Sequence, residues 1–237
     1  MYTKETSFSR RMKQAEQHAA SLLQQILIFV LIFLVIFMML GYLVKFFPET
    51  LAGIDSSIQT SVRGDLPANA TTFFKIVTNF GHEVFIFVYV FAIAFVFYFW
   101  KKWKAEAILL AGNLVLMGIF STGFKYLYNR PRPSIQYFIP KPMGPSFPSW
   151  HCAATMVVAL SLVVIMEQHL TKMILKRCLQ VLVVVIALTT ALSRIYLGVH
   201  YPSDILGGWL LAFTIVAATY PFYDKKRFEW RFQGKQE

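Results

Sequence analysis

The chain carries little charge for its length. Only 15% of its 237 residues are Asp, Glu, Lys or Arg, whereas soluble domains contain about 25%. Hydrophobic residues make up 57% of the chain, and they are gathered in runs long enough to cross a bilayer. This composition excludes an ordinary soluble domain and indicates a polytopic membrane protein.

Cysteine and acidic residues are both scarce. The two cysteines, Cys152 and Cys178, lie in or beside apolar runs and match no metal spacing or disulfide framework. We interpret both as small buried apolar residues. Lys and Arg number 23 against 12 acidic residues, so the net charge is +11. Most of the basic residues flank apolar runs, which indicates contact with lipid headgroups rather than with nucleic acid.

Six apolar runs predict an all-α fold of six transmembrane helices in one membrane domain. The first run follows a basic tail, residues 1–20, and is too long for the hydrophobic region of a signal peptide. A loop at 125–149 holds six prolines, which exclude a continuous helix there. A second basic tail, residues 224–237, ends the chain. The predicted spans are residues 22–47, 84–100, 105–124, 150–168, 179–196 and 205–222.

The segment between the first and second spans, residues 48–83, is too polar to cross the bilayer. Phe73, Phe74, Ile76 and Val77 predict one short interfacial amphipathic helix within it. This helix either caps the bundle and gates lipid entry or simply packs against the spans.

The distribution of basic residues predicts the orientation. Six spans place both termini on one side, and fifteen of the 23 Lys and Arg residues fall on that side. Cytoplasmic segments carry the excess of Lys and Arg, so we expect cytoplasmic termini in a multi-pass protein of the cell membrane. The loops after the first, third and fifth spans then face outward.

Two of the outward loops carry the unusual ionisable residues. Because alternate loops lie on the same side of the membrane, these residues are expected to converge at the outer face. The set comprises Lys125, Arg130, Arg132, Ser149 and His151 around the first of these loops, and Arg194, His200 and Asp204 around the second.

The basic members of this set predict a phosphate site. Lys125, Arg132 and Arg194 supply positive charge, and guanidinium groups match phosphate oxygens well. Ser149 precedes the fourth span, where it can cap the helix while the free N–H groups of the first turn attract an anion. Of the few acidic residues on the outer face, only Asp204 lies within these motifs, which argues against a metal held by carboxylates.

The two histidines suit the two halves of a phosphoryl transfer. Asp204 lies four residues after His200, so it can fix one ring nitrogen and leave the other free to attack phosphorus. His151, in the first turn of its helix, is then the proton donor to the leaving oxygen and later activates water.

Several other residues have simpler interpretations. Arg130 is either a further phosphate ligand or a solvated neighbour of the site. Ser193 is a supporting helix residue. We interpret Lys45, Lys75 and Lys141 as membrane anchors, and His18, His82 and His169 as structural or solvated.

Three motifs resemble those of a known family. Residues 125–133, KYLYNRPRP, fit K-x6-R-P. Residues 148–151, PSWH, are close to P-S-G-H, and residues 193–204, SRIYLGVHYPSD, fit S-R-x5-H-x3-D. In these motifs the chain resembles the type 2 phosphatidic acid phosphatase superfamily.

This resemblance implies a membrane phosphatase that needs neither metal nor cofactor and works through a phosphohistidine. Substrates of similar bacterial members are phosphatidylglycerol phosphate, phosphatidic acid and undecaprenyl pyrophosphate. The implied roles are nucleophile for His200, its partner for Asp204, acid for His151, and phosphate binding for Lys125, Arg132, Ser149, Arg194 and the position of Trp150.

Trp150 departs from the family pattern, which has glycine at this position. Glycine lets the backbone approach a phosphate closely, whereas an indole fills the pocket, displaces His151 or turns toward lipid. Two alternatives therefore stay open beside a lipid phosphatase. One is a phosphatase for a soluble phosphate ester, and the other is a non-catalytic protein that binds or transports a lipid phosphate.

Overall fold

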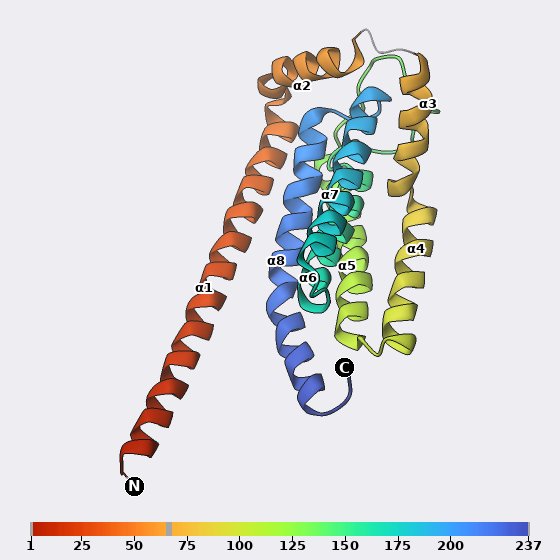
Figure 1. Cartoon of the computed structure of the whole chain (residues 1–237). Coiled ribbons are helices and arrows are strands. Elements are labelled where there is room, and N and C mark those ends of the chain that lie inside the picture. Colours follow the sequence, from red (N-terminus) through yellow and green to blue (C-terminus); the bar gives the residue numbers. More distant parts are fainter. Residues whose placement is uncertain (1, 65–67, 237) are drawn as a thin grey trace.

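A computed structural model describes residues 2–64 and 68–236, and this part of the chain contains helices and loops but no strands (Figure 1). The predicted all-α fold is confirmed. The side chains of residues 1–19 are not described, so the basic side chains of the predicted N-terminal tail lie outside the described part of the chain. The elements are α1 (Tyr2–Phe46), α2 (Pro48–Arg63), α3 (Ala68–Val77), a 3₁₀ turn (Thr78–Gly81), α4 (Glu83–Phe95), a π-helical turn (Val96–Trp100), α5 (Lys104–Tyr128), α6 (Trp150–His169), α7 (Met173–Tyr196) and α8 (Pro202–Phe232).

Six helical segments in this part of the chain are long and apolar enough to span a membrane. Several helices extend beyond the predicted apolar runs, because hydropathy marks the apolar part of a helix rather than its ends. For example, α5 continues four residues past Phe124 and ends where Asn129 adopts a left-handed conformation, φ 48°. The spanning segments are Ala20–Phe46, Glu83–Trp100, Lys104–Tyr128, Trp150–His169, Met173–Tyr196 and Pro202–Phe232.

The centre of the bundle is α6, which packs against α5, α7 and α8. A polar contact joins three of these helices, since Asn113 donates to Ser161 (2.9 Å) and accepts from Thr219 (2.8 Å). At the start of α6, Gly208 of α8 allows close approach, because a β-carbon there would lie 2.8 Å from the Ser149 carbonyl oxygen. Small residues at such crossings let membrane helices pack tightly.

At the edge of the bundle, α1 packs chiefly against α8 and leans away from it toward the N-terminus (Figure 1). Most of the described side chains in its apolar part are exposed, including Leu27, Phe29 and Leu31. Exposed apolar residues on a helix of this length are suited to contact with lipid.

The segment between the first two spans differs from the prediction of a single short helix. It forms two helices, the predicted one as α3 and another, α2, which crosses the end of the bundle (Figure 1). Leu51, Ile54, Ile58 and Val62 give α2 a helical apolar pattern that the prediction overlooked. Ile54 and Ile58 are exposed, however, and the buried residues of α2 are the polar Asp55 and Gln59, so the apolar pattern does not reveal which face packs on the bundle.

One prediction for the cysteines was wrong. Cys152 is buried, whereas Cys178 is exposed near the start of α7. Apolar residues that precede Cys178 are exposed too, since Met173 and Ile174 in the first turn of α7 face outward. A position beside an apolar run therefore did not imply burial of Cys178.

Candidate active site

The chain encloses a cavity of about 580 Å³, lined by residues of α4, α5, α6 and α7 and of the loops next to them. The loop between α5 and α6 lies at the end of the bundle that α2 crosses (Figure 1). This loop, the N-terminal turn of α6 and the loop between α7 and α8 surround the cavity. Six of the eight predicted site residues line this cavity, and Ser149 and Asp204 are buried beside it. The six are Lys125, Arg132, Trp150, His151, Arg194 and His200.

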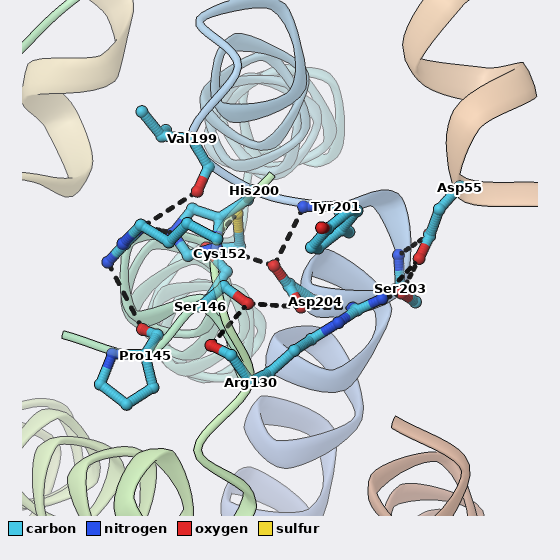
Figure 2. Close-up of polar contacts among 12 residues, drawn as sticks. Asp55, Arg130, Pro145, Ser146, Cys152, Val199, His200, Tyr201, Ser203 and Asp204 are labelled. Carbon is cyan, nitrogen blue, oxygen red and sulfur yellow. Dashed lines mark hydrogen bonds and ion pairs between the residues drawn. The ribbon is translucent and has the colours of Figure 1, made fainter. Parts of the chain in front are cut away.

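His200 is held in one orientation by a buried carboxylate. Its Nδ1 lies 3.1 Å from Oδ2 of Asp204, which also accepts a bond from the Tyr201 backbone N–H at 3.0 Å (Figure 2). On the other side of the ring, Nη1 of Arg132 lies 3.3 Å from Nε2. A carboxylate at Nδ1 and a donor at Nε2 favour the neutral tautomer with its proton on Nδ1. The electron pair of Nε2 therefore lies on the side of the ring next to Arg132, which lines the cavity together with His200.

The surroundings of His200 also favour its neutral form. Burial lowers the pKa of His200 well below its ordinary value, and the positive charges of Arg194, Lys125, Arg132 and Arg130 act in the same direction. A neutral imidazole retains the electron pair that a nucleophile needs.

Backbone carbonyl groups orient two of the cations that line the cavity. Lys125 donates to the Pro145 carbonyl oxygen at 2.8 Å, and Arg132 donates to the carbonyl oxygens of Gly144 (3.0 Å) and Val199 (2.9 Å). These contacts fix the side chains without neutralising their charge, so an anion in the cavity would still be attracted.

Arg194 has an unsatisfied donor. Its Nη1 donates to Thr78 at 2.7 Å, but Nε has no hydrogen-bond partner among the described residues. Only 3% of the residue is exposed. Buried donors are normally satisfied. An acceptor bound in the cavity would satisfy the Nε–H of Arg194.

His151 and Ser149 occupy the start of α6. His151 lines the cavity, and its ring lies 6.4 Å from that of His82. Ser149 is the N-cap residue, but the side-chain cap predicted for it is wrong, because its hydroxyl donates to the Cys152 sulfur at 3.1 Å instead. The N–H groups of the first turn are therefore not capped by this hydroxyl.

Trp150 forms part of the cavity wall. It is 7% exposed, so it does not turn toward lipid, and its ring packs 6.1 Å from that of Phe87. Both residues line the cavity. Of the alternatives for this position, the structure supports an indole that narrows the site.

Arg130 is neither a cavity ligand nor solvated, as the two sequence-based alternatives had it. It is 6% exposed and donates to Asp55 at 2.8 Å and to Asp204 at 2.7 Å (Figure 2). Burial alone would lower the pKa of Arg130, but Asp204 and Asp55 outweigh it and raise this pKa above its ordinary value. The guanidinium is a fixed charge between two buried carboxylates.

Two residues near the site were missed from the sequence. Asp55 gave no signal except its place four residues before Gln59, which puts both on one face of α2. Glu83, which was not among the predicted site residues, lines the cavity with the cations. In the described part of the chain no group of three or more His, Cys, Asp or Glu is arranged for a metal ion.

Comparisons with known proteins agree with this architecture. Residues 106–228 match the PAP2 superfamily. The fold is similar to a transmembrane PAP2-type phosphatidylglycerolphosphate phosphatase from Bacillus subtilis, with a TM-score of 0.74 and 21% identity over 83% of this chain and 96% of that one. LpxE of Aquifex aeolicus gives a TM-score of 0.57 and 22% identity, covering 71% and 95% of the two chains. At these identities the likeness is one of fold.

Two curated proteins are similar in sequence over shorter stretches. A lipid A 4'-phosphatase of Bacteroides thetaiotaomicron is 35% identical over 78 residues, which are 30% of this chain and 31% of that protein. An undecaprenyl-diphosphatase of Sulfolobus acidocaldarius is 28% identical over 116 residues, 47% and 52% of the two chains. The chain thus matches about a third of one relative and about half of the other.

Proposed function

Because the chain belongs to the PAP2 superfamily, we propose that it is an integral-membrane phosphatase that hydrolyses a lipid phosphate or pyrophosphate. The observation that carries this proposal is the position of His200, whose Nδ1 is held by Asp204 and which lines a cavity together with Lys125, Arg132 and Arg194. Positive charge and an unsatisfied buried donor attract a phosphate, and the imidazole stands ready to attack it.

In the first step the phosphoryl group passes to His200. The electron pair on Nε2 forms a bond to phosphorus while the bond from phosphorus to the leaving oxygen breaks. Protonated His151 donates its proton to that oxygen, so a phosphomonoester releases its lipid as an alcohol, and a pyrophosphate releases the lipid monophosphate. Asp204 balances the positive charge that develops on the ring as the N–P bond forms.

In the second step water regenerates the enzyme. His151, now neutral, takes a proton from the water as its oxygen attacks phosphorus. The N–P bond breaks and its electron pair returns to Nε2. Inorganic phosphate leaves, and both histidines regain their starting protonation states, without any residue or ion beyond those already named.

The substrates that we propose are phosphatidylglycerol phosphate, phosphatidic acid and undecaprenyl pyrophosphate. The names of the similar proteins, which include a phosphatidylglycerolphosphate phosphatase and an undecaprenyl-diphosphatase, support a lipid phosphate. Apolar residues such as Phe87 and Trp150 line the cavity beside the cations, as an amphiphilic substrate requires. The excess of basic residues near the termini supports an outward-facing site.

Phosphate release from a panel of lipid phosphates in detergent micelles, with EDTA present, tests this function. We expect release from at least one lipid, unaffected by EDTA and abolished in His200→Ala. Brief reaction with ³²P-labelled substrate should leave an acid-labile, alkali-stable label on the protein. Equal rates with short-chain water-soluble esters would favour a soluble substrate instead.

Trp150 supports a second candidate, a protein that binds a lipid phosphate without hydrolysing it. The indole narrows the cavity at the position where its relatives' motif has glycine. This candidate predicts saturable binding of the lipid phosphate and no phosphate release even at high protein concentration.

A further inference from the structure

We propose that Asp55 is a positioning residue for phosphoryl transfer, which neutralises Arg130 so that Asp204 can balance the charge developing on His200. This inference rests on the proposed function. Asp55 lies on α2, about seventy residues before the first motif and outside the region that matches the family.

Three contacts tie the Asp55 carboxylate to the site, and a fourth from the same face of α2 is made by Gln59. It accepts from Arg130 at 2.8 Å, from the Ser203 backbone N–H at 2.9 Å and from the Ser203 hydroxyl at 2.6 Å. One turn further along α2, the side-chain amide of Gln59 donates to the His200 carbonyl oxygen at 3.2 Å. The buried face of α2 therefore contacts the loop that carries the nucleophile and the start of α8.

By itself, the positive charge of Arg130 beside Asp204 would work against the role proposed for Asp204. Nη1 of Arg130 lies 2.7 Å from Oδ1 of Asp204, while His200 uses Oδ2 of the same carboxylate. A lone guanidinium at this distance would cancel the negative charge that a phosphorylated imidazole needs. With Asp55 present, two carboxylates share one guanidinium, so the cluster keeps one negative charge next to His200.

Burial makes this charge arrangement matter. Asp55 is 1% exposed and Asp204 is fully buried. Burying charged groups is costly unless they are paired, so a surface helix would gain more by burying apolar residues. The only buried residues of α2 are nevertheless Asp55 and Gln59, and both contact the loop or helix start around His200.

The cations around His200 act in the opposite direction to Asp204, and Glu83 of α4 is a further carboxylate that lines the cavity. Lys125 from α5, Arg194 from α7, and Arg132 and Arg130 from the loop before α6 are all positive. His151 of α6 lines the same cavity. Asp204 of α8 is the carboxylate in contact with the ring, so any change in its effective charge should alter the titration of His200.

The first test compares Asp55→Asn with Glu49→Gln, a matched control that removes another α2 carboxylate. We expect Asp55→Asn to lower kcat at least about tenfold, to change KM less than about threefold, and to move the acidic limb of the kcat/KM profile to lower pH. The control should match the wild type. Asp55→Glu, which keeps the charge, should restore the position of the acidic limb.

A double variant separates charge balance from mere anchoring. Asp55→Asn with Arg130→Gln removes both charges and leaves Asp204 with its full negative charge again. We expect this protein to have a higher kcat than Asp55→Asn alone. If Asp55 only anchors α2, the double variant should be no better than the single one, and the proposal would be overturned.

A measurement without turnover keeps this test independent of the proposed function. The chain has five histidines, so ¹⁵N-histidine spectra in detergent can follow each ring through a pH titration, with His200→Ala identifying the signal. The midpoint of His200 should fall in folded Asp55→Asn. An unchanged midpoint, or unfolding of every Asp55 variant, would refute the inference. Absence of phosphate release by the wild type would refute only the proposed function.

Discussion

Trp150 is the residue at which a single substitution should improve the enzyme. Its indole narrows the cavity and also packs against Phe87. We expect Trp150→Gly to raise turnover per folded molecule by giving the phosphate closer access to the backbone. The same change removes a buried aromatic ring, which costs about 3–5 kcal/mol of stability.

Phosphate release normalised to folded protein, together with thermal unfolding in detergent, measures both effects. Trp150→Phe is the control that keeps an aromatic wall and should resemble the wild type. Turnover of the tryptophan form equal to that of the glycine form would contradict the prediction.

His200 should also make the folded protein sensitive to acid. Its pKa is lowered in the folded state by burial and by nearby cations, while an unfolded histidine titrates near about 6.5. Below that pH the unfolded chain binds a proton that the folded chain does not. Stability should therefore fall as pH drops below about 6.5, by about 1 kcal/mol per pH unit from this residue.

Melting temperatures at pH 7.5 and pH 5.5 for the wild type and His200→Gln test this linkage. The decrease on acidification should be smaller in His200→Gln, because the titrating group is gone. An equal decrease in the two proteins would show that His200 does not contribute.

The motifs in the sequence predicted the cations and two histidines that line the cavity, but not which groups each side chain contacts. Basic residues at span ends are common, so Lys125, Arg132 and Arg194 are recognisable because each belongs to one of the motifs in the outward loops. The ion pairs of Arg130 depend on a partner 75 residues away, and no local pattern encodes such a distance. The thiol contact of Ser149 likewise depends on a rotamer rather than on residue type.

At the level of helices, the crossing of α6 and α8 should not accommodate a side chain at Gly208. A β-carbon at Gly208 would lie 2.8 Å from the Ser149 carbonyl oxygen and 3.1 Å from the Ala153 nitrogen, both backbone atoms. Gly208→Ala should therefore displace the start of α6 and with it His151. Overpacking of this kind costs about 1–3 kcal/mol, and we expect activity to fall at least about tenfold.

Gly112→Ala on α5 is the matched control. Among the described residues no atom lies within 4 Å of its added β-carbon, so activity should be unchanged and the helix slightly stabilised. Wild-type activity in Gly208→Ala would mean that the crossing is looser than its geometry indicates.

Among the elements, the membrane helices followed from hydropathy, whereas α2 did not. Apolar runs predict spans because lipid imposes one requirement along their whole length. For α2, the buried face is Asp55 and Gln59, so its stability depends on partners that only the assembled bundle provides. Its position could not be deduced before those partners were placed.

For the molecule as a whole, the proposed orientation predicts which loops are reachable from outside the cell. Met143, in the loop before α6, is 96% exposed, and Lys172 lies in the loop at the opposite end of the bundle. In a Cys178→Ser background, a membrane-impermeant maleimide should label Met143→Cys in intact cells. It should label Lys172→Cys only after permeabilisation, and the reverse pattern would invert the topology.

The ion pair between α2 and the α5–α6 loop also bears on how far this protein can be shortened. The stretch that matches the superfamily, residues 106–228, contains every motif residue but not Asp55. A fragment trimmed to that stretch would enclose the guanidinium of Arg130 with half of its counter-charge removed. Minimal versions of such proteins designed from their motifs alone would therefore discard a carboxylate that the nucleophile's own partner depends on.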